Sequence, residues 1–292
     1  MNRAELIERK KGIGGSDSAP ALGVSKWKSP YQLWLEKTSD EISDFDNDAM
    51  FWGRTLEPVI RQRYSDKTGR TVIVPPERII HPKYNFIRAN LDGIADGHRI
   101  LEIKTARSDI GWGEPGSNEI PDEYTCQVQH YMMVTGLVVA DIAVLIGGSD
   151  FRLYEVPEDK ELQEAMLYAE TLFWQLVINR IEPEVSTFTD LQLKFGRSSV
   201  ESRVQASPEA VEAIERLKAI KAIAKEEDNI KAVIMAALKE NDTLVFGDSV
   251  LATWKASNGS KRFDAKAFQA DHPDLYNKYL KQGEPVRRLL LK

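Results

Sequence analysis

Cysteine is nearly absent from this sequence, because its 292 residues contain a single one, Cys126. One cysteine cannot form an internal disulfide, which is typical of a protein kept in a reducing compartment. The sequence also has no long apolar run, and its first residues, MNRAELIERKK, lack the apolar centre of a secretion signal. We therefore expect a soluble, cytoplasmic protein that makes no contact with a membrane.

Several common kinds of catalytic site are missing as well. The four histidines show no zinc-binding spacing, and a lone cysteine excludes a cysteine-rich metal site. The segment GIGGSD does not match the GxxxxGK[ST] pattern of a phosphate-binding loop. The sharp turn that carries a nucleophilic serine in hydrolases is also absent. These absences leave open an enzyme whose carboxylates hold metal ions.

Acidic residues outnumber basic ones by 45 to 39, so the net charge is −6. The excess is uneven: residues 201–292 hold 16 basic and 14 acidic residues, whereas residues 1–200 hold 23 and 31. Overall charge governs solubility and steering rather than what a single cleft binds. The acidic total argues against a protein that wraps DNA non-specifically, but it is compatible with a carboxylate-rich active site.

Periodicity and turn residues predict an α/β fold for residues 1–195, with a mixed sheet flanked by helices. Ser29 is a predicted N-cap with Pro30 at the first helical position, and Gly69 and Gly136 each end a helix. The predicted helices cover 29–39, 49–69, 121–136 and 158–181, and the predicted strands lie near 71–80, 85–95, 99–106, 137–148 and 151–157.

A smaller module is predicted to follow a polar, serine-rich linker at residues 195–207. Residues 207–240 predict one long helix, or two packed helices with a break at Asp228–Asn229. Strands within 243–255 and a short helix near 264–281 complete a helix-rich α+β module, residues 207–292. Its role stays open between clamping DNA, binding a partner protein and aiding assembly.

The segment LDGIADGHRILEIKTA, residues 91–106, predicts a β-hairpin that carries acids and a lysine. Asp96 and Gly97 tolerate the positive φ of a tight turn. A turn of two or three residues pairs Asp92 with residue 101 or 102, which places its carboxylate about 4–8 Å from that of Glu102. Strand alternation puts Glu102 and Lys104 on one face of the strand.

Two carboxylates at that separation repel each other unless a cation lies between them. Hard oxygen ligands suit Mg²⁺ or Mn²⁺, which retain waters and accept substrate phosphate as a further ligand. A neighbouring lysine can orient or activate a water there. The same residues also fit a plainer reading, a solvated hairpin with a surface Glu–Lys pair.

The pattern Asp, about ten residues, then Glu-x-Lys, with a helix on each side, resembles the PD-(D/E)xK nucleases. Four blocks in order make the sequence similar to the family of lambda exonuclease and the YqaJ-type viral recombinases. They span roughly residues 9–136, and Leu91 departs from the signature, which has proline there. The blocks are RKKGIGGSDSAPALGVSKWKSPYQLWLEKT, WGRTLEPVIRQRY, LDG…LEIKTA and YTCQVQHYMMVTG.

The resemblance implies a role for each matching residue of the metal site. Asp92 and Glu102 are the implied metal ligands, with the backbone carbonyl of Ile103 as a further one, and two ions per site are implied. Lys104 matches the catalytic lysine near the attacking water. Glu57 matches a helix carboxylate that completes the site; its alternative is a glutamate that faces solvent.

Two further pairs match the family. Gln127 and Tyr131 lie one helical turn apart, and the resemblance places them beside the metal site; a surface glutamine and a core tyrosine are the alternative. Arg9 and Ser16 match the residues that hold the terminal 5′-phosphate of DNA. An arginine fork suits phosphate and a Gly–Ser turn frees backbone N–H groups, although the turn also fits the simple start of a helix at Ser16 or Asp17.

The implied function is a Mg²⁺-dependent 5′→3′ exonuclease that digests one strand of duplex DNA from an end. Its 3′-tailed product would feed a single-strand annealing protein of phage recombination in a bacterial host cell. The resemblance also implies a closed trimeric ring around DNA. The alternatives are an endonuclease, a Cas4-type nuclease, which the missing iron–sulfur cysteines disfavour, and a catalytically silent factor that binds DNA ends.

Trp27 and Trp34 are candidates for stacking on bases, although core packing fits Trp34 better.

Overall fold

The computed structural model describes residues 3–40, 46–185, 187–197, 203–256, 263–283, 287 and 289–290. The chain divides into two compact units, Met1–Leu191 and Gln192–Lys292. Searching the described residues for a helix long and apolar enough to cross a bilayer finds none.

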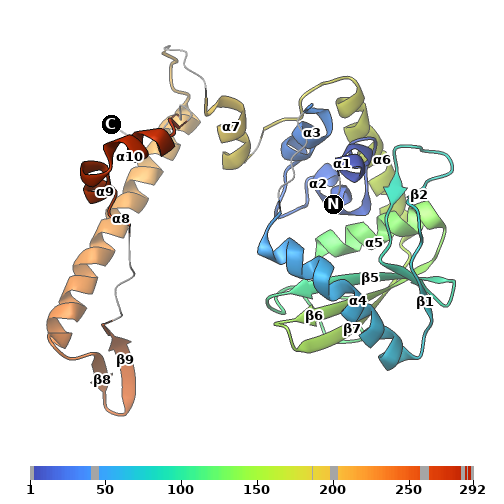
Figure 1. Ribbon diagram of the computed structural model, residues 1–292, viewed down its shortest axis with the longest axis horizontal. Helices are drawn as coiled ribbons and strands as arrows, with labels where there is room; N and C mark the ends of the chain where they lie inside the picture. The colour runs from blue at the N-terminus through green and yellow to red at the C-terminus, as the bar shows by residue number, and fades with distance from the viewer. Residues whose placement is uncertain are drawn as a thin grey trace. The chain divides into compact units, whose positions relative to one another are not determined.

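A five-stranded mixed sheet forms the centre of the first unit, in the order β1-β4-β5-β6-β7 (Figure 1). Strands β5 and β6 run parallel, and every other neighbouring pair in this sheet is antiparallel. A separate two-stranded sheet is made by β2 (Ile79–Ile80) and β3 (Arg88–Ala89). The five strands are β1 (Val72–Ile73), β4 (Gly93–Ala95), β5 (Arg99–Ala106), β6 (Val139–Ile146) and β7 (Asp150–Pro157).

Helices cover both faces of this sheet (Figure 1). Helix α4 packs Ile60 and Tyr64 on one face, and α5 packs Val128 and Met132 on the other. Helix α7 (Phe188–Phe195) spans the boundary between the units. The remaining helices of the first unit are α1 (Arg3–Arg9), α2 (Gly15–Leu22), α3 (Pro30–Thr38), α4 (Asp48–Thr68), α5 (Asp122–Thr135) and α6 (Lys160–Ile178).

The predicted fold class is confirmed, and so are several predicted helix ends. The hydroxyl of Ser29 caps α3 by accepting from the backbone N–H of Gln32 at 3.1 Å. Gly69 and Gly136 end α4 and α5 with φ of 72° at each position, a conformation that glycine adopts without strain. The predicted strands at 71–80 and 85–95 were too long, because the described strands there have two or three residues each.

The second unit contains one long helix, α8 (Pro208–Leu238), which continues through Asp228 and Asn229 without a break. A hairpin of β8 (Thr243–Phe246) and β9 (Ser249–Thr253) follows it. The single helix predicted near 264–281 is wrong, because two helices are present, α9 (Ala265–Asp271) and α10 (Pro273–Tyr279). Pro273 has no N–H and fits the first turn of a helix, so it separates the two.

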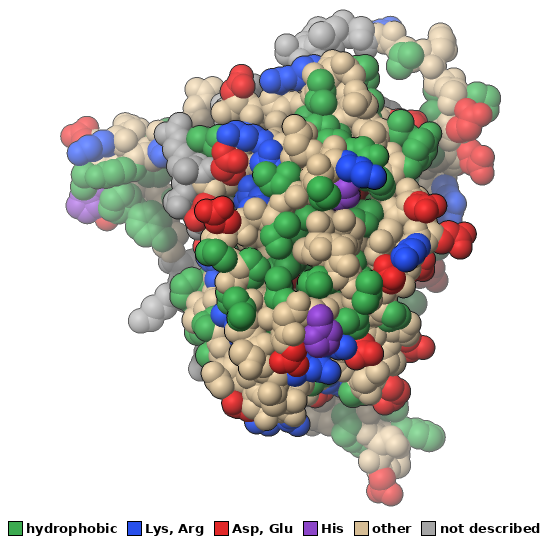
Figure 2. Space-filling view, turned by 90° about the vertical axis from the view of Figure 1, so that its right-hand side faces the viewer, with side chains coloured by type: hydrophobic (Ala, Val, Ile, Leu, Met, Phe, Trp, Pro, Cys, Tyr) green, Lys and Arg blue, Asp and Glu red, His purple; other side chains and the backbone are tan. Residues whose placement is uncertain are grey.

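One face of the first unit is seen in Figure 2, where acidic and basic side chains are interspersed around hydrophobic ones. Among the described side chains of this face, no broad patch of one charge is visible. A protein that binds DNA by wrapping needs many clustered lysine and arginine contacts to phosphates. This face therefore does not resemble such a surface.

Candidate active site

The predicted hairpin is present and its turn has the predicted residues. Asp96 and Gly97 have φ of 49° and 73°, and Gly93 pairs with Leu101 across the two antiparallel strands β4 and β5. The preceding residue, Asp92, therefore lies opposite Glu102. One oxygen of the Asp92 carboxylate accepts a hydrogen bond of 2.8 Å from the backbone N–H of Ile103, which holds the acid against β5.

The side chains of β5 alternate between the two helices. Leu101 and Ile103 belong to the apolar cluster under α4. Glu102 and Lys104 point to the opposite face, where both contact Gln127 of α5. The prediction that Glu102 and Lys104 share a face is therefore confirmed, and the face is the one covered by α5.

Gln127 connects three polar side chains of this face. Its amide oxygen accepts a hydrogen bond of 3.0 Å from the Lys104 ammonium, and its amide nitrogen donates to Glu102 Oε1 at 2.6 Å. The same nitrogen donates to the Tyr131 hydroxyl at 2.9 Å. Lys104 also donates directly to Glu102 Oε1 at 2.5 Å. The predicted pair on α5 therefore adjoins the predicted acid and lysine on β5.

The second carboxylate oxygen of Glu102 has a different environment. Oε2 is buried and has no hydrogen-bond partner among the described residues, and the residue as a whole is 2% exposed. A buried oxygen without a partner costs free energy that a ligand can recover. A hard cation suits such an oxygen, so the donor set of Asp92 and Glu102 fits a divalent metal ion.

The charges of the site follow from its burial. Burial and the nearby charge of Glu102 raise the pKa of Asp92 to about 8. Burial also raises the pKa of Glu102, although the ammonium of Lys104 opposes the shift. Burial alone would lower the pKa of Lys104, but the two carboxylates outweigh it and raise that pKa. Lys104 is therefore an ammonium that donates hydrogen bonds, and a cation would favour ionised acids beside it.

Glu57 lies on α4 and reaches this site through another residue. Its carboxylate is ion-paired with Arg61, and the Arg61 Nε donates to the backbone carbonyl of Asp92 at 3.0 Å. The charge of Glu57 contributes to raising the pKa of both Asp92 and Glu102. Across the residues that the structure describes, no three His, Cys, Asp or Glu side chains form a ready cluster for a metal ion. The role of Glu57 as a ligand stays a prediction.

Sequence reasoning missed Arg61, although the sequence contained a signal for it. Glu57 and Arg61 stand four residues apart in WGRTLEPVIRQRY, the spacing at which side chains meet on a helix. The structure shows that this arginine bridges the α4 carboxylate and the hairpin that carries Asp92.

Arg9 and Ser16 lie next to each other, with 3.5 Å between Arg9 Nη2 and the Ser16 hydroxyl. Helix α2 begins at Gly15, one residue before the earlier of the two predicted starts. A Cβ at Gly15 would lie 2.4 Å from a ring carbon of Tyr131. Only glycine permits this approach, so the Gly–Ser turn packs directly on the tyrosine that bonds Gln127.

A buried ion pair behind this turn was also missed. Lys37 Nζ donates to Asp17 Oδ2 at 2.6 Å and to the backbone carbonyl of Arg9 at 2.7 Å. Burial opposes ionisation of Asp17, but the charges of Lys37 and Arg9 outweigh it and lower its pKa to about 2. Lys37 and Asp17 therefore hold together the two segments that carry Arg9 and Ser16.

An aromatic group adjoins the predicted catalytic lysine. Lys104 Nζ lies 4.9 Å from the ring centroid of Tyr124, which lies on α5. The Tyr124 ring has Trp112 at 5.5 Å on one side and Trp27 at 6.2 Å on another, measured between ring centroids. Trp34, by contrast, is 8% exposed and belongs to an apolar cluster of the core, as its sequence context predicted.

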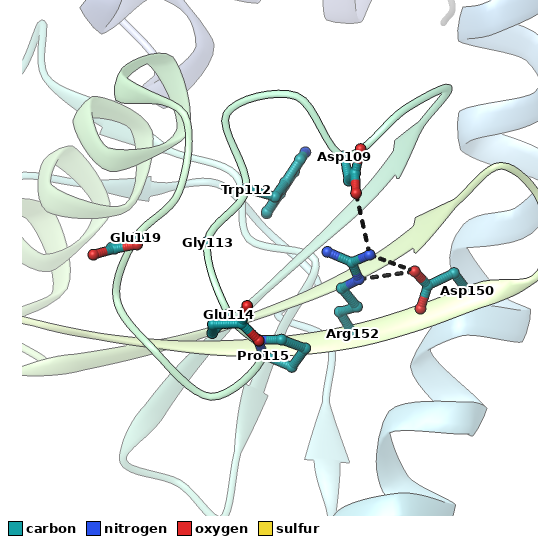
Figure 3. Close-up of a pocket in the computed structure, with 8 residues that line it drawn as sticks. All are labelled: Asp109, Trp112, Gly113, Glu114, Pro115, Glu119, Asp150 and Arg152. Atoms are coloured by element: carbon teal, nitrogen blue, oxygen red, sulfur yellow. Dashed lines mark hydrogen bonds and ion pairs between the residues drawn. The ribbon is translucent and has the colours of Figure 1, made fainter.

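A pocket of about 530 Å³ lies beyond the end of β5, where the 107–121 loop meets β7 (Figure 3). In it, Arg152 forms ion pairs with Asp109 at 3.5 Å and with Asp150 at 2.7 Å. Four acidic residues and one arginine line it, so it is poorly suited to hold a DNA phosphate. The lining residues are Asp109, Trp112, Gly113, Glu114, Pro115, Glu119, Asp150 and Arg152.

Comparisons with known proteins place the chain among relatives. A family model described as the YqaJ-like viral recombinase domain matches residues 6–138. The uncharacterized protein YqaJ of Bacillus subtilis (strain 168) is 35% identical over 299 residues, covering 97% of this chain and 92% of that protein.

Two solved structures of LHK-Exo share the fold, each with a TM-score of 0.50 and 22% identity. One, in complex with dAMP, matches over 66% of this chain and 97% of its own. The other, described as an alkaline exonuclease from Laribacter hongkongensis, matches over 61% and 94%. The chain thus shares the fold of LHK-Exo, and by its similarity to YqaJ it belongs to the YqaJ-like viral recombinase family.

Proposed function

We propose that this chain is a metal-dependent deoxyribonuclease that digests one strand of duplex DNA from an end in the 5′→3′ direction. The proposal rests on the buried Oε2 of Glu102, beside Asp92 and Lys104, for which the described part of the chain offers no hydrogen-bond partner. Membership of the viral recombinase family supports it, as does a fold shared with an alkaline exonuclease.

Asp92, Glu102 and the carbonyl of Ile103 would hold Mg²⁺ or Mn²⁺, with Glu57 completing a site for two ions. Bound cations supply Lewis acidity and neutralise the charge that develops on the phosphate during hydrolysis. Glu102 is suited to this because one of its oxygens is already oriented by Gln127 and Lys104, which leaves Oε2 for the metal.

The chain's own residues orient the reactants. Lys104 would orient or activate the attacking water, or donate a hydrogen bond to a phosphate oxygen. Gln127 holds Lys104 in place, and Tyr131 in turn holds Gln127. Such preorganised donors stabilise developing negative charge without rearranging during the reaction.

Arg9 and Ser16, on the turn that packs against Tyr131, would receive the terminal 5′-phosphate. This placement links the end of one strand to the cleavage site through α5 and supports the 5′→3′ direction. The product would be a duplex with 3′ single-stranded tails, used by a single-strand annealing protein of phage recombination in the cytoplasm of a bacterial host. A trimeric ring around DNA belongs to the same proposal.

The test compares Lys104→Ala with wild type and with Lys160→Ala, a lysine whose side chain is 78% exposed. Linear duplexes with 5′-phosphate or 5′-hydroxyl ends and a covalently closed circle are incubated with and without Mg²⁺. We expect wild type and Lys160→Ala to digest the 5′-phosphorylated linear duplex only when Mg²⁺ is present. The Lys104→Ala rate of digestion should be at least about 100-fold lower than that of wild type. Cleavage of the circle would indicate an endonuclease, and equal rates for all three proteins would place the site elsewhere.

A further inference from the structure

Trp27 is the most exposed of the six tryptophans, all of which lie in described residues, with 68% of its surface accessible. It lies in the short connection between α2 and α3. Tryptophan buries more apolar surface than almost any other residue in most proteins. An exposed indole therefore has a large free-energy gain available from a ligand that covers it.

The connection that carries Trp27 is held in place by hydrogen bonds. The Ser25 hydroxyl accepts from the backbone N–H groups of Trp27 at 3.2 Å and Lys28 at 3.3 Å. The N–H of Lys26 donates to the carboxylate of Glu123, a 5% exposed residue in the first turn of α5, at 3.2 Å. The indole is thus presented to solvent by a fixed backbone, which reduces the entropy lost when a ligand binds.

Tyr124 lies close to both Trp27 and the predicted catalytic lysine, which limits how far apart these two residues can be. The Tyr124 ring centroid lies 6.2 Å from that of Trp27 and 4.9 Å from Lys104 Nζ. The Trp27 ring centroid therefore lies at most about three base steps of a DNA strand, at about 3.4 Å each, from Lys104 Nζ. A phosphate at Lys104 therefore brings the nearest few nucleobases within reach of the indole.

We infer that Trp27 stacks on an unpaired nucleobase of DNA, a few nucleotides from the phosphate that is cleaved; this rests on the proposed function. Base–aromatic stacking tolerates every sequence because each base has a π-face. The residues beside Trp27 are polar or basic, Ser25, Lys26 and Lys28, and the Lys26 side chain is 70% exposed. This polar and basic environment is better suited to binding a nucleic acid, which has flat bases and negative charge, than to binding an apolar protein surface.

The experiment measures binding of two duplex ends to the full chain without divalent cation, so that no cleavage occurs. The duplexes are identical except that the three terminal nucleotides of the 5′ strand are abasic in one. Wild type is expected to bind the end with bases roughly 5- to 100-fold more tightly, the range that one stacked base spans. Trp27→Ala is expected to bind both ends equally and weakly, and Trp27→Phe to keep part of the preference.

The matched control is Tyr168→Ala, because Tyr168 on α6 is also 68% exposed, and it should behave as wild type. A base preference retained by Trp27→Ala would overturn the inference. DNA binding unaffected by Trp27→Ala would also overturn it, with a protein partner as the remaining occupant. If binding depends on the bases but no nucleotides are released in Mg²⁺, the stacking inference holds and the nuclease proposal is wrong. If the protein cleaves DNA but shows no base preference, the nuclease proposal holds and the stacking inference is wrong.

Discussion

Two buried carboxylates on neighbouring strands of one sheet have opposite environments. Asp141 on β6 is 4% exposed, and Arg99 donates to both of its oxygens, at 2.5 Å and 2.9 Å. Arg70 and the Tyr64 hydroxyl add further donors to Oδ2, Arg70 at 2.6 Å. Glu102 on β5 is as deeply buried, yet only one of its two oxygens is bonded and the other has no partner among the described residues.

The difference separates an acid whose partners stabilise the fold from an acid that we propose to bind a metal ion. Burial does not distinguish the two, since both are nearly inaccessible. The number of donors does, because the guanidinium groups and the hydroxyl around Asp141 already offset its charge, and a metal ion would have to compete with them. Arg99 and Arg70 make Asp141 a closed ion-pair group, whereas, within the described ranges, Glu102 forms an ion pair with Lys104 alone.

Substituting the open acid should have the largest effect on activity. Glu102→Gln keeps an oxygen for Lys104 and Gln127 but replaces the oxygen proposed to bind metal with an amide nitrogen that donates. We expect DNA hydrolysis to fall by about 1,000-fold, because charge stabilisation by a metal is worth several kcal/mol. Metal-free thermal stability should be equal to that of wild type or higher, since a buried acid with a raised pKa is removed.

The measurement combines single-turnover cleavage of a 5′-phosphorylated duplex with thermal unfolding in EDTA. Glu155→Gln serves as the matched control, because Glu155 is an acid of β7 with a side chain 58% exposed. A Glu102→Gln protein that cleaves DNA at the wild-type rate would contradict the proposal that Glu102 binds the catalytic metal.

Substituting the closed acid should have the opposite consequence. Asp141→Ala leaves Arg99 and Arg70 without their shared carboxylate, and breaking a buried ion pair costs about 3 kcal/mol or more in unfolding free energy. Cleavage per folded molecule should remain within a few-fold of wild type, because the partners of Asp141 are Arg99, Arg70 and Tyr64 rather than the residues of the proposed metal site. Denaturant unfolding and active-site titration test this, and a stable but inactive Asp141→Ala would be inconsistent with a purely structural role.

Local sequence patterns predicted much of the geometry of this site. The correct predictions are those that depend only on residues close together in the sequence. The hairpin turn at Asp96–Gly97 and the alternation of Glu102 and Lys104 depend on neighbouring residues alone, so the sequence predicted both correctly. The caps at Ser29 and Gly136 are equally local. Family resemblance added the long-range proposal that Gln127 and Tyr131 lie beside β5, and the structure brings them there.

The missed features depend on packing between distant segments. Asp17 and Lys37 are separated by 20 residues, and no periodicity shows that two helices bring them to 2.6 Å. Sequence reasoning also could not show that Glu102 Oε2 lacks a partner among the described residues, because this depends on which donors fail to reach it. The division into a nuclease domain at 1–195 and an accessory module at 207–292 remains a proposal.

A third buried acid, Asp17, extends the comparison to pH. Its pKa is lowered to about 2 against an ordinary value of 3.8. Between these values the folded state binds fewer protons than the unfolded state, so acid favours unfolding. The contribution, about 2 kcal/mol, is fully present above pH 4 and is lost as the pH falls through about 2. Denaturant unfolding of wild type and Asp17→Asn should show a difference in stability that shrinks as the pH falls from about 4 to about 2. A difference that stays constant over this range would mean that the ion pair with Lys37 does not lower the pKa of Asp17.

The smallest expected effect, stabilisation of the protein by a bound cation, tests the contrast between Glu102 and Asp141 most directly. A cation that fills the open site binds the folded state and stabilises it, by about 1.4 kcal/mol at ten times its dissociation constant. Mg²⁺ or Mn²⁺ should therefore raise the unfolding temperature of wild type and of Glu155→Gln but not that of Glu102→Gln. Asp141→Ala, although less stable, should show the same cation-dependent increase as wild type, because its loss lies in the closed group. An increase that is equal in Glu102→Gln would mean that the cation binds elsewhere, and the unpartnered oxygen would then have no role in holding metal.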